Sequence, residues 1–350
     1  MRGTHLVFVI LMAQCFIATA EENIFYGSCD ASAAVALDKN TFVVADDEDN
    51  ILRIYSLKRP GMPLAQYPLD VFLGAQNESH IESDIEACAR VGDLIYWITS
   101  HGRNKKGKWR NSRYRFFATK IINEEGKFIL KPEGIAYENL LSALVSCSGI
   151  NLKTSVGVIG EDAGKDLAPK EQGLNIEGLS TNADGSVLYI GLRNPIPERQ
   201  AILIPIKNPN AVVHGKAGPI LGVPVHLNVQ GRGIRSIDYS PYHKRYLLVA
   251  GDRSNKLSSV LYSWDGEPES VPKKIRSFVN LNPEAIAPVP ESEKILIFSD
   301  DGTVAHSVDQ EDSFDKLVDG KCVCKSLKDP RKKRFRSLAL ILNKQKFVEE

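Results

Sequence analysis

Acidic, basic and polar side chains recur in this chain in pairs separated by 15 or 16 residues. The first member of each pair opens a short apolar segment, and the second closes the apolar segment that follows. The five pairs are Asp30 with Asp46, Glu86 with His101, Glu177 with Arg193, Ser236 with Asp252, and Glu284 with Asp300. In an antiparallel hairpin, the start of the first strand lies beside the end of the second. Each pair is therefore expected to meet at one edge of its hairpin.

Carboxylates gathered from several hairpins would repel one another, and they would stay ionised only beside a cation or basic side chains. Hard oxygen ligands favour Ca²⁺ or Mg²⁺ over softer metals. We therefore predict a Ca²⁺ or Mg²⁺ site formed by Glu86, Glu177, Glu284 and Asp30. The alternative is structural: each glutamate accepts backbone N–H hydrogen bonds from a neighbouring hairpin and holds the repeats together.

The same edge would carry the groups that bind and process a substrate. His101 is the candidate general acid or base, because the unperturbed pKa of histidine lies near neutrality. Arginine binds phosphate and carboxylate groups through two parallel hydrogen bonds. The predicted substrate-binding residues are Arg103, Arg193, Arg235, Asp252 and Asp300. The expected partner is an anionic small molecule.

The fourth repeat departs from the others, because Ser236 stands where they carry an acid and Arg235 lies beside it. We expect the substrate anion to bind at this break in the pattern. The second repeat runs into a basic loop at residues 101–110. This loop predicts either an electropositive flap that attracts the anion or a solvated hairpin tip.

The elements that position these residues are repeated hairpins. Gly or Asp marks the turns, and β-branched and aromatic residues fill the second strands. Further strand-like stretches follow each hairpin, so about four strands recur five or so times, which predicts an all-β protein, a β-propeller of five or six blades. The long interval between the second and third repeats contains helix-like spacing, which predicts a short helical insertion near 137–150, or else a sixth blade. If the first strand of each repeat is innermost, the paired residues converge around the central channel. A pair of β-sandwiches is the alternative architecture.

Composition narrows the classes of function. The 350 residues include 44 basic and 43 acidic side chains, for a net charge of +1, which argues against a nucleic-acid partner. Apolar residues make up 43% of the chain, an ordinary globular value that excludes disorder, collagen and coiled coil for the whole chain. The sequence has no G-x-S-x-G elbow, Walker loop, HExxH motif or Rossmann glycine pattern.

The N-terminus has the pattern of a secretory signal peptide. Arg2 precedes an apolar run from Leu6 to Ile17, and Ala18-Thr19-Ala20 resembles a cleavage site. We predict a signal peptide at 1–20 and a single β-propeller domain at 21–350. The alternative is a membrane anchor, for which the apolar run is short of the ~20 residues that a span requires. We therefore expect a secreted or periplasmic monomer with no stable membrane insertion after cleavage.

Five cysteines remain after the predicted cleavage, at positions 29, 88, 147, 322 and 324. Because the number is odd, at least one thiol stays free or pairs between chains. No matching set of His and Cys residues makes Cys322-Val323-Cys324 a zinc site. The sequence leaves the pairing open between at most two disulfides and buried free thiols.

Three phrases carry a resemblance to a known family: Asp84-Ile85-Glu86, the stretch from Tyr96 to Gly107, and Asn175-Ile176-Glu177-Gly178-Leu179. With these phrases the chain, from about Tyr26 to Leu342, resembles the bacterial domain-of-unknown-function family numbered 3616, whose activity is unassigned. The Asn-x-Glu-Gly/Ala openings at Glu177 and Glu284 are also similar to those of phytase-like esterase β-propellers. That second resemblance implies calcium and a phosphate-ester substrate.

Two functions fit these expectations. The first is a metal-dependent hydrolase of a phosphate ester or lactone, in which the metal polarises the substrate or activates water and His101 moves a proton. The second is a non-enzymatic propeller that binds a ligand or a protein at the same funnel.

Overall fold

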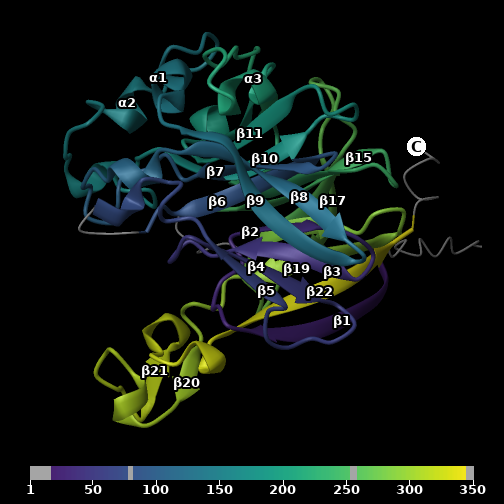
Figure 1. Cartoon of the computed structure of the whole chain (residues 1–350). Coiled ribbons are helices and arrows are strands. Elements are labelled where there is room, and N and C mark those ends of the chain that lie inside the picture. The colour runs from purple at the N-terminus through teal and green to yellow at the C-terminus, as the bar shows by residue number, and fades with distance from the viewer. Residues whose placement is uncertain (1–16, 78–81, 253–257, 344–350) are drawn as a thin grey trace, which may run out of the picture.

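The chain folds as a five-bladed β-propeller (Figure 1). The computed structural model describes residues 17–77, 82–252 and 258–343, with side chains from residue 21 onward. Each blade is an antiparallel sheet of four strands. The predicted all-β propeller is confirmed with five blades, and the long interval between the second and third repeats contains helices and loops. Residues 1–16 of the predicted signal peptide lie outside the described residues.

In each blade, the first strand of the repeat lies at one edge of the four-stranded sheet, and the other three strands follow it in order. The first blade contains β2 (Ala33–Ala36), β3 (Thr41–Ala45), β4 (Ile51–Ser56) and β5 (Ala65–Pro68), and the second contains β6 (Ile85–Val91), β7 (Leu94–Thr99), β8 (Phe116–Glu124) and β9 (Lys127–Tyr137). The third contains β10 (Asn175–Thr181), β11 (Leu188–Asn194), β12 (Ala201–Ile206) and β13 (Val225–Leu227), and the fourth contains β14 (Gly233–Ser240), β15 (Arg245–Gly251), β16 (Val260–Trp264) and β17 (Lys273–Ser277). The fifth contains β18 (Pro283–Pro288), β19 (Lys294–Ser299), β22 (Arg334–Leu342) and β1 (Ile17–Tyr26).

The first strand of each repeat lies innermost, which meets the condition for the paired residues to converge. Strands β2, β6, β10, β14 and β18 contact one another in sequence, and β18 contacts β2 to close the ring. Space near the axis is limited, which explains small residues on these strands. A Cβ atom at Gly178 would lie 2.8 Å from the Ile234 side chain of the next blade, and one at Gly191 would lie 2.7 Å from it. Any larger residue at these two positions would push the third and fourth blades apart.

The ring is closed by strands from both ends of the chain. β1 is the outer strand of the fifth blade and pairs with β22, from Glu21 opposite Ala339 to Tyr26 opposite Arg334. Phe25 of β1 is fully buried, and its ring lies 5.0 Å from that of Phe42 and 5.5 Å from that of Phe335. This aromatic cluster packs the first blade against the fifth.

Three insertions interrupt the blade pattern. Helices α1 (Leu140–Val145) and α2 (Lys153–Val156) follow the second blade, where a helical insertion was predicted, and α3 (Pro209–Val213) lies within the third blade. A hairpin of β20 (Ala305–Ser307) and β21 (Lys321–Val323) interrupts the fifth blade and projects from the propeller at the lower left of Figure 1.

A single disulfide joins Cys29 to Cys324, while Cys88, Cys147 and Cys322 are free among the described residues. The bond links the segment before the first blade to the hairpin insertion of the fifth.

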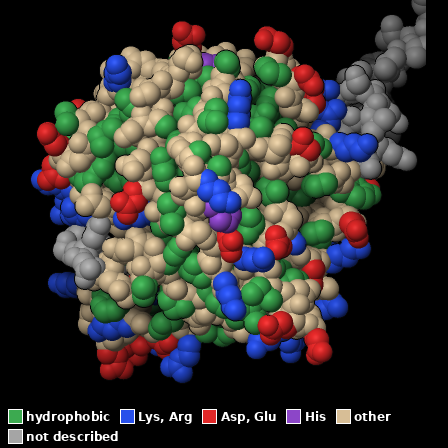
Figure 2. Space-filling model, turned by 45° about the horizontal axis from the view of Figure 1, so that its top comes forward, with side chains coloured by type: hydrophobic (Ala, Val, Ile, Leu, Met, Phe, Trp, Pro, Cys, Tyr) green, Lys and Arg blue, Asp and Glu red, His purple; other side chains and the backbone are tan. Residues whose placement is uncertain are grey.

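Over the face drawn in Figure 2, acidic and basic side chains are interspersed, in keeping with the nearly equal numbers of each. Within the described ranges, no helix has the length and apolar character needed to cross a bilayer.

Replacing Phe25 with Ala should lower the free energy of unfolding by about 3–5 kcal/mol, because a fully buried aromatic ring at the closing seam is lost. Replacing its neighbour Ile24, which is 38% exposed, with Ala should cost less than about 1 kcal/mol. Denaturant titration of both variants measures the difference. Equal losses would show that β1 does not close the ring in this way.

Candidate functional site

A β-bulge recurs at the same place in four of the five blades. The pairing of the first two strands skips one residue between Ile85 and Ala87, between Ile176 and Gly178, between Ile234 and Ser236, and between Pro283 and Ala285. Bulges re-aim a side chain and disturb the local pairing. The skipped residues are Glu86, Glu177, Arg235 and Glu284. In the first blade the corresponding acid, Asp30, lies three residues before β2.

This register corrects the alignment of the fourth repeat. Arg235, rather than Ser236, occupies the position of the acids in the other blades. Ser236 is paired within the strand, and its hydroxyl accepts a hydrogen bond from the backbone N–H of Ile286 in the next blade, at 3.0 Å. Spacing alone aligned the fourth repeat one residue too far along the chain, because the sequence does not reveal the bulge.

Arg235 joins carboxylates from the blades on either side of it. Its guanidinium is ion-paired with Glu284, and its Nε lies 3.8 Å from Glu177 Oε2. Glu177 is also paired with Arg193 at 2.5 Å, and it accepts a hydrogen bond from the Asn175 side chain at 2.7 Å. Arg235 is only 1% exposed. The positive charge that replaces an acid in the fourth repeat therefore links three blades. An incoming anion would have to compete with Glu177 and Glu284 for Arg235.

Carboxylates outnumber guanidinium groups at this end of the channel. A cavity of about 340 Å³ opens there. The buried and half-buried carboxylates in and beside it belong to Asp30, Asp47, Asp84, Glu86, Glu177, Glu284 and Asp300, and the arginines among them are Arg113, Arg193 and Arg235. Glu171 and the lysines at 105, 165 and 170 are exposed at its rim. The excess negative charge among the buried and half-buried groups favours bound protons or a cation.

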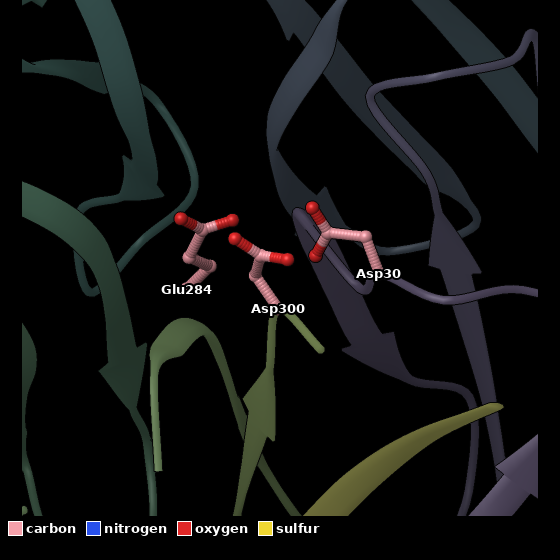
Figure 3. Close-up of side chains that lie close together, drawn as sticks. All are labelled: Asp30, Glu284 and Asp300. Carbon is pink, nitrogen blue, oxygen red and sulfur yellow. The ribbon is translucent and has the colours of Figure 1, made fainter. Parts of the chain in front are cut away.

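Two groups of three carboxylates stand out. The oxygens of Asp30, Glu284 and Asp300 lie within 4.8 Å of one another, and Figure 3 shows the three side chains pointing toward each other. Asp47, Asp84 and Glu86 form the second group, with the same limit on their separation. Such oxygen sets suit hard cations.

The electrostatics of the first group centre on Asp30. Its side chain is 4% exposed, and its Oδ1 has no hydrogen-bond partner among the described residues. Burial raises the pKa of Asp30 well above its ordinary value, and the negative charge of Asp300 adds to the rise. Asp300 is better satisfied, since it accepts hydrogen bonds from Gly302 N at 2.7 Å and from the Asn282 amide at 2.9 Å.

The second group shows the same physics. Burial raises the pKa of Asp47 and of Glu86 well above the ordinary values, and neighbouring carboxylates add to both shifts. Burial raises the pKa of Asp84 to about 6, against the opposing charge of Arg113, which lies 2.7 Å away. Asp47 Oδ1 also lacks a partner within the described part of the chain.

The structure brings together most of the site residues predicted from the sequence, but it divides the four predicted metal ligands. Asp30 and Glu284 lie together, Glu86 belongs to the second group, and Glu177 is paired with two arginines instead. The predicted residues that line the cavity are Glu86, Glu177, Arg193, Glu284 and Asp300. Asp30 and Arg235 lie directly behind it through their contacts with Glu284. Asp252, which follows β15, is half-buried. Burial lowers the pKa of Arg193, but its pairing with Glu177 outweighs that effect and raises the pKa, and the charge of Asp252 adds a smaller contribution in the same direction.

His101 is placed differently from the expectation. It does not line the cavity. The residue is 1% exposed, its Nδ1 lies 2.9 Å from the carbonyl oxygen of Thr99, and its ring lies edge-on to Tyr114 at 5.9 Å. Burial lowers the pKa of His101 to about 4, so the imidazole is neutral at pH 7. A catalytic role for His101 stays a prediction without a contact to the carboxylates.

Arg103 holds a loop. It is 4% exposed, and its guanidinium donates hydrogen bonds to the carbonyl oxygens of Val156, Val158 at 2.8 Å and Glu161 at 3.0 Å. These bonds fasten the segment after α2 to the rim of the second blade. An anion-binding role for Arg103 also stays a prediction.

Sequence reasoning overlooked several residues at the mouth of the cavity. Asp47, Asp84 and Arg113 lie among the carboxylates, and Lys165 and Lys170 come from the loop that precedes the third blade. A signal was present for two of them, since Asp47 follows the paired Asp46 and Asp84 lies two residues before Glu86. Nothing in the sequence marks the loop residues, because their position depends on how the insertion folds.

Comparisons with known proteins give only distant structural similarities. No family model and no curated protein matches the chain. Among solved structures it is similar to the β-propeller domain of Cps50 (Swd1) from Myceliophteria thermophila, with 9% identity, 92% of this chain and 98% of that chain covered, and a TM-score of 0.39. It is also similar to glutaminyl cyclase from Myxococcus xanthus, with 13% identity, 79% and 90% covered, and a TM-score of 0.38. Raptor from Chaetomium thermophilum matches at 10% identity and a TM-score of 0.34 over 80% of this chain, which spans 20% of the Raptor chain. Likenesses this distant carry nothing about activity.

The low pKa of His101 predicts a specific loss of stability in acid. Between pH 6.5 and about 4 the unfolded chain binds a proton on this histidine and the folded protein does not, so acidification favours unfolding. Relative to His101→Asn, which tolerates the positive φ of 50°, the wild type should lose about 2–3 kcal/mol between pH 7 and 4.5. Denaturant titrations across this range measure the difference, and parallel profiles for the two proteins would contradict it.

Proposed function

We propose that this propeller is a cation-dependent hydrolase with its site at the carboxylate-rich mouth of the channel. Its substrate would be an anionic molecule that contains either a phosphate ester or a lactone. The observation that carries the proposal is the group of Asp30, Glu284 and Asp300, because Asp30 is buried beside the two other carboxylates and its Oδ1 has no hydrogen-bond partner among the described residues. A divalent cation would remove the repulsion, satisfy that oxygen and leave coordination positions for substrate and water.

The residues present fit Ca²⁺ or Mg²⁺. Asp30, Glu284 and Asp300 supply only oxygen atoms, and no histidine or thiol joins them within the described residues. Asp47, Asp84 and Glu86 form a second candidate site of the same kind. A bound cation would polarise the ester and activate a water molecule.

Basic residues at the rim support an anionic substrate. Lys105, Lys165 and Lys170 are exposed at the cavity, and the described residues offer none of them an ion pair. The loop that carries Lys105 is held in place, because the Asn104 side chain accepts hydrogen bonds from Lys106 N at 2.9 Å and Lys108 N at 3.0 Å. This arrangement favours the flap over the solvated tip.

A second cavity of about 510 Å³ continues the site outward. It shares Lys105, Arg113, Asp47 and Asp84 with the inner cavity, and Phe314 of the hairpin insertion forms part of its wall. The parts of a substrate that do not react would occupy this outer space, beside Lys105 and the exposed ring.

The alternative is a propeller that binds the anion and cation without turnover. The position of His101 favours this candidate, because the predicted proton carrier does not reach the cavity. Membership of the family numbered 3616 and export from the cell are further proposals. Export is supported by the Cys29–Cys324 disulfide, since such bonds persist mainly in oxidising compartments.

Asp30→Asn should weaken Ca²⁺ or Mg²⁺ binding by about tenfold or more, because one carboxylate ligand is lost. Glu171→Gln is the matched control, since Glu171 is an exposed acid on the rim of the same cavity, and it should bind as the wild type does. Calorimetric titration measures both affinities. Without divalent cations, Asp30→Asn should unfold at the same or a higher temperature, because a buried amide costs less than a buried carboxylate. Equal affinities for the two variants would remove Asp30 from the site.

A panel of phosphate esters and lactones, assayed with Ca²⁺, Mg²⁺ or a chelator, tests the activity itself. We expect turnover of at least one ester that the chelator abolishes and that Asp30→Asn lowers. Turnover of nothing in the panel, with cation binding intact, would favour the binding propeller. No turnover and no effect of the chelator on the melting temperature would contradict both.

A further inference from the structure

The disulfide lies directly beside the candidate cation site. Cys29 immediately precedes Asp30, and Cys324 belongs to the hairpin insertion of the fifth blade. Both cysteines are buried, at 4% and 0% exposure, and their Cα atoms are 5.8 Å apart. The bond joins positions that are 295 residues apart in sequence.

Backbone hydrogen bonds connect this disulfide to the other side of the carboxylate group. Asp301 N donates to the carbonyl oxygen of Cys29 at 3.0 Å, and Cys324 N donates to that of Val304 at 2.9 Å. The segment from Asp300 to Val304 therefore lies between the two halves of the cross-link. Asp300, one of the three carboxylates, opens that segment.

Asp30 depends on its backbone for its position. Its Oδ1 accepts no hydrogen bond from a described residue, whereas Ser28 Oγ donates to the Asp30 carbonyl oxygen at 2.8 Å. When neither a cation nor a proton is bound at Asp30, repulsion from Glu284 and Asp300 would push its carboxylate away from the site. The groups that resist this displacement are those that hold residues 28–30, and the disulfide is the covalent one.

We propose that the Cys29–Cys324 disulfide is a positioning element of the cation site, and that its reduction weakens divalent-cation binding at Asp30, Glu284 and Asp300. This inference rests on the proposed function. On reduction by a dithiol, the S–S bond breaks, each cysteine gains one electron and one proton as a thiol, and the dithiol becomes a disulfide. The loop at residues 28–30 is then free to relax, and part of the free energy of cation binding is used to restore the position of Asp30.

A purely stabilising cross-link would behave differently. It would lower the melting temperature when removed and leave the affinity of the folded protein for the cation unchanged. A positioning cross-link changes the affinity at temperatures where the protein is fully folded. The two roles are therefore separated by measuring both quantities on the same samples.

The experiment titrates Ca²⁺ by calorimetry into the oxidised wild type, the wild type reduced with dithiothreitol, and the double variant Cys29→Ser/Cys324→Ser. Cys322→Ser is the matched control, because Cys322 is 6% exposed in the same apolar cluster and forms no disulfide. We expect the reduced protein and the double variant to bind Ca²⁺ about tenfold more weakly, and Cys322→Ser to match the wild type.

Near-ultraviolet circular dichroism establishes that each sample is folded during the titration. If the double variant fails to fold, the reduced wild type decides the question. Wild-type affinity in a folded protein that lacks the disulfide would overturn the inference while leaving the proposed function intact. Absence of Ca²⁺ binding by the oxidised wild type would instead contradict the proposed function, and the inference with it.

Discussion

The mouth of this propeller is governed by an imbalance of buried charge. Seven buried or half-buried carboxylates lie among three arginines there, while Glu171 and three lysines are exposed at the rim, and each blade contributes at least one acid or one arginine at its inner edge. Arg235 neutralises part of this negative charge through its contacts with Glu177 and Glu284. Asp30 and Asp47 retain buried oxygens without donors among the described residues, so the site is incomplete without a proton or a cation. The proposal of a cation site follows from this excess of negative charge.

The fold creates this imbalance by repetition. A β-bulge at the same position of four inner strands directs one side chain per blade into a common space. The ring thereby brings carboxylates from distant parts of the chain within a few ångströms of one another. Closure by β1 and the Cys29–Cys324 bond then hold the first and fifth blades together beside Asp30. Stability and the geometry of the site thus depend on the same contacts.

Hydrophobic alternation and turn residues were sufficient to predict the hairpins, and the convergence of Glu86, Glu177 and Glu284 followed once the first strand of each repeat was taken as innermost. They were insufficient where an irregular backbone conformation at a single residue decides which way its side chain points. The bulge made Arg235 equivalent to the acids, and a positive φ at His101 accompanies a side chain that packs within its own blade. The pairing of Cys29 with Cys324 and the use of Glu21–Tyr26 as a closing strand depend on contacts between the ends of the chain, which local pattern does not encode.

The central claim is that a divalent cation completes the group of Asp30, Glu284 and Asp300. A crystal structure of the oxidised protein grown with Mn²⁺, which has a strong anomalous signal and accepts the same oxygen ligands, tests it most directly. The account predicts an anomalous peak in contact with all three carboxylates. Well-ordered carboxylates with no peak between them at saturating Mn²⁺ would contradict it.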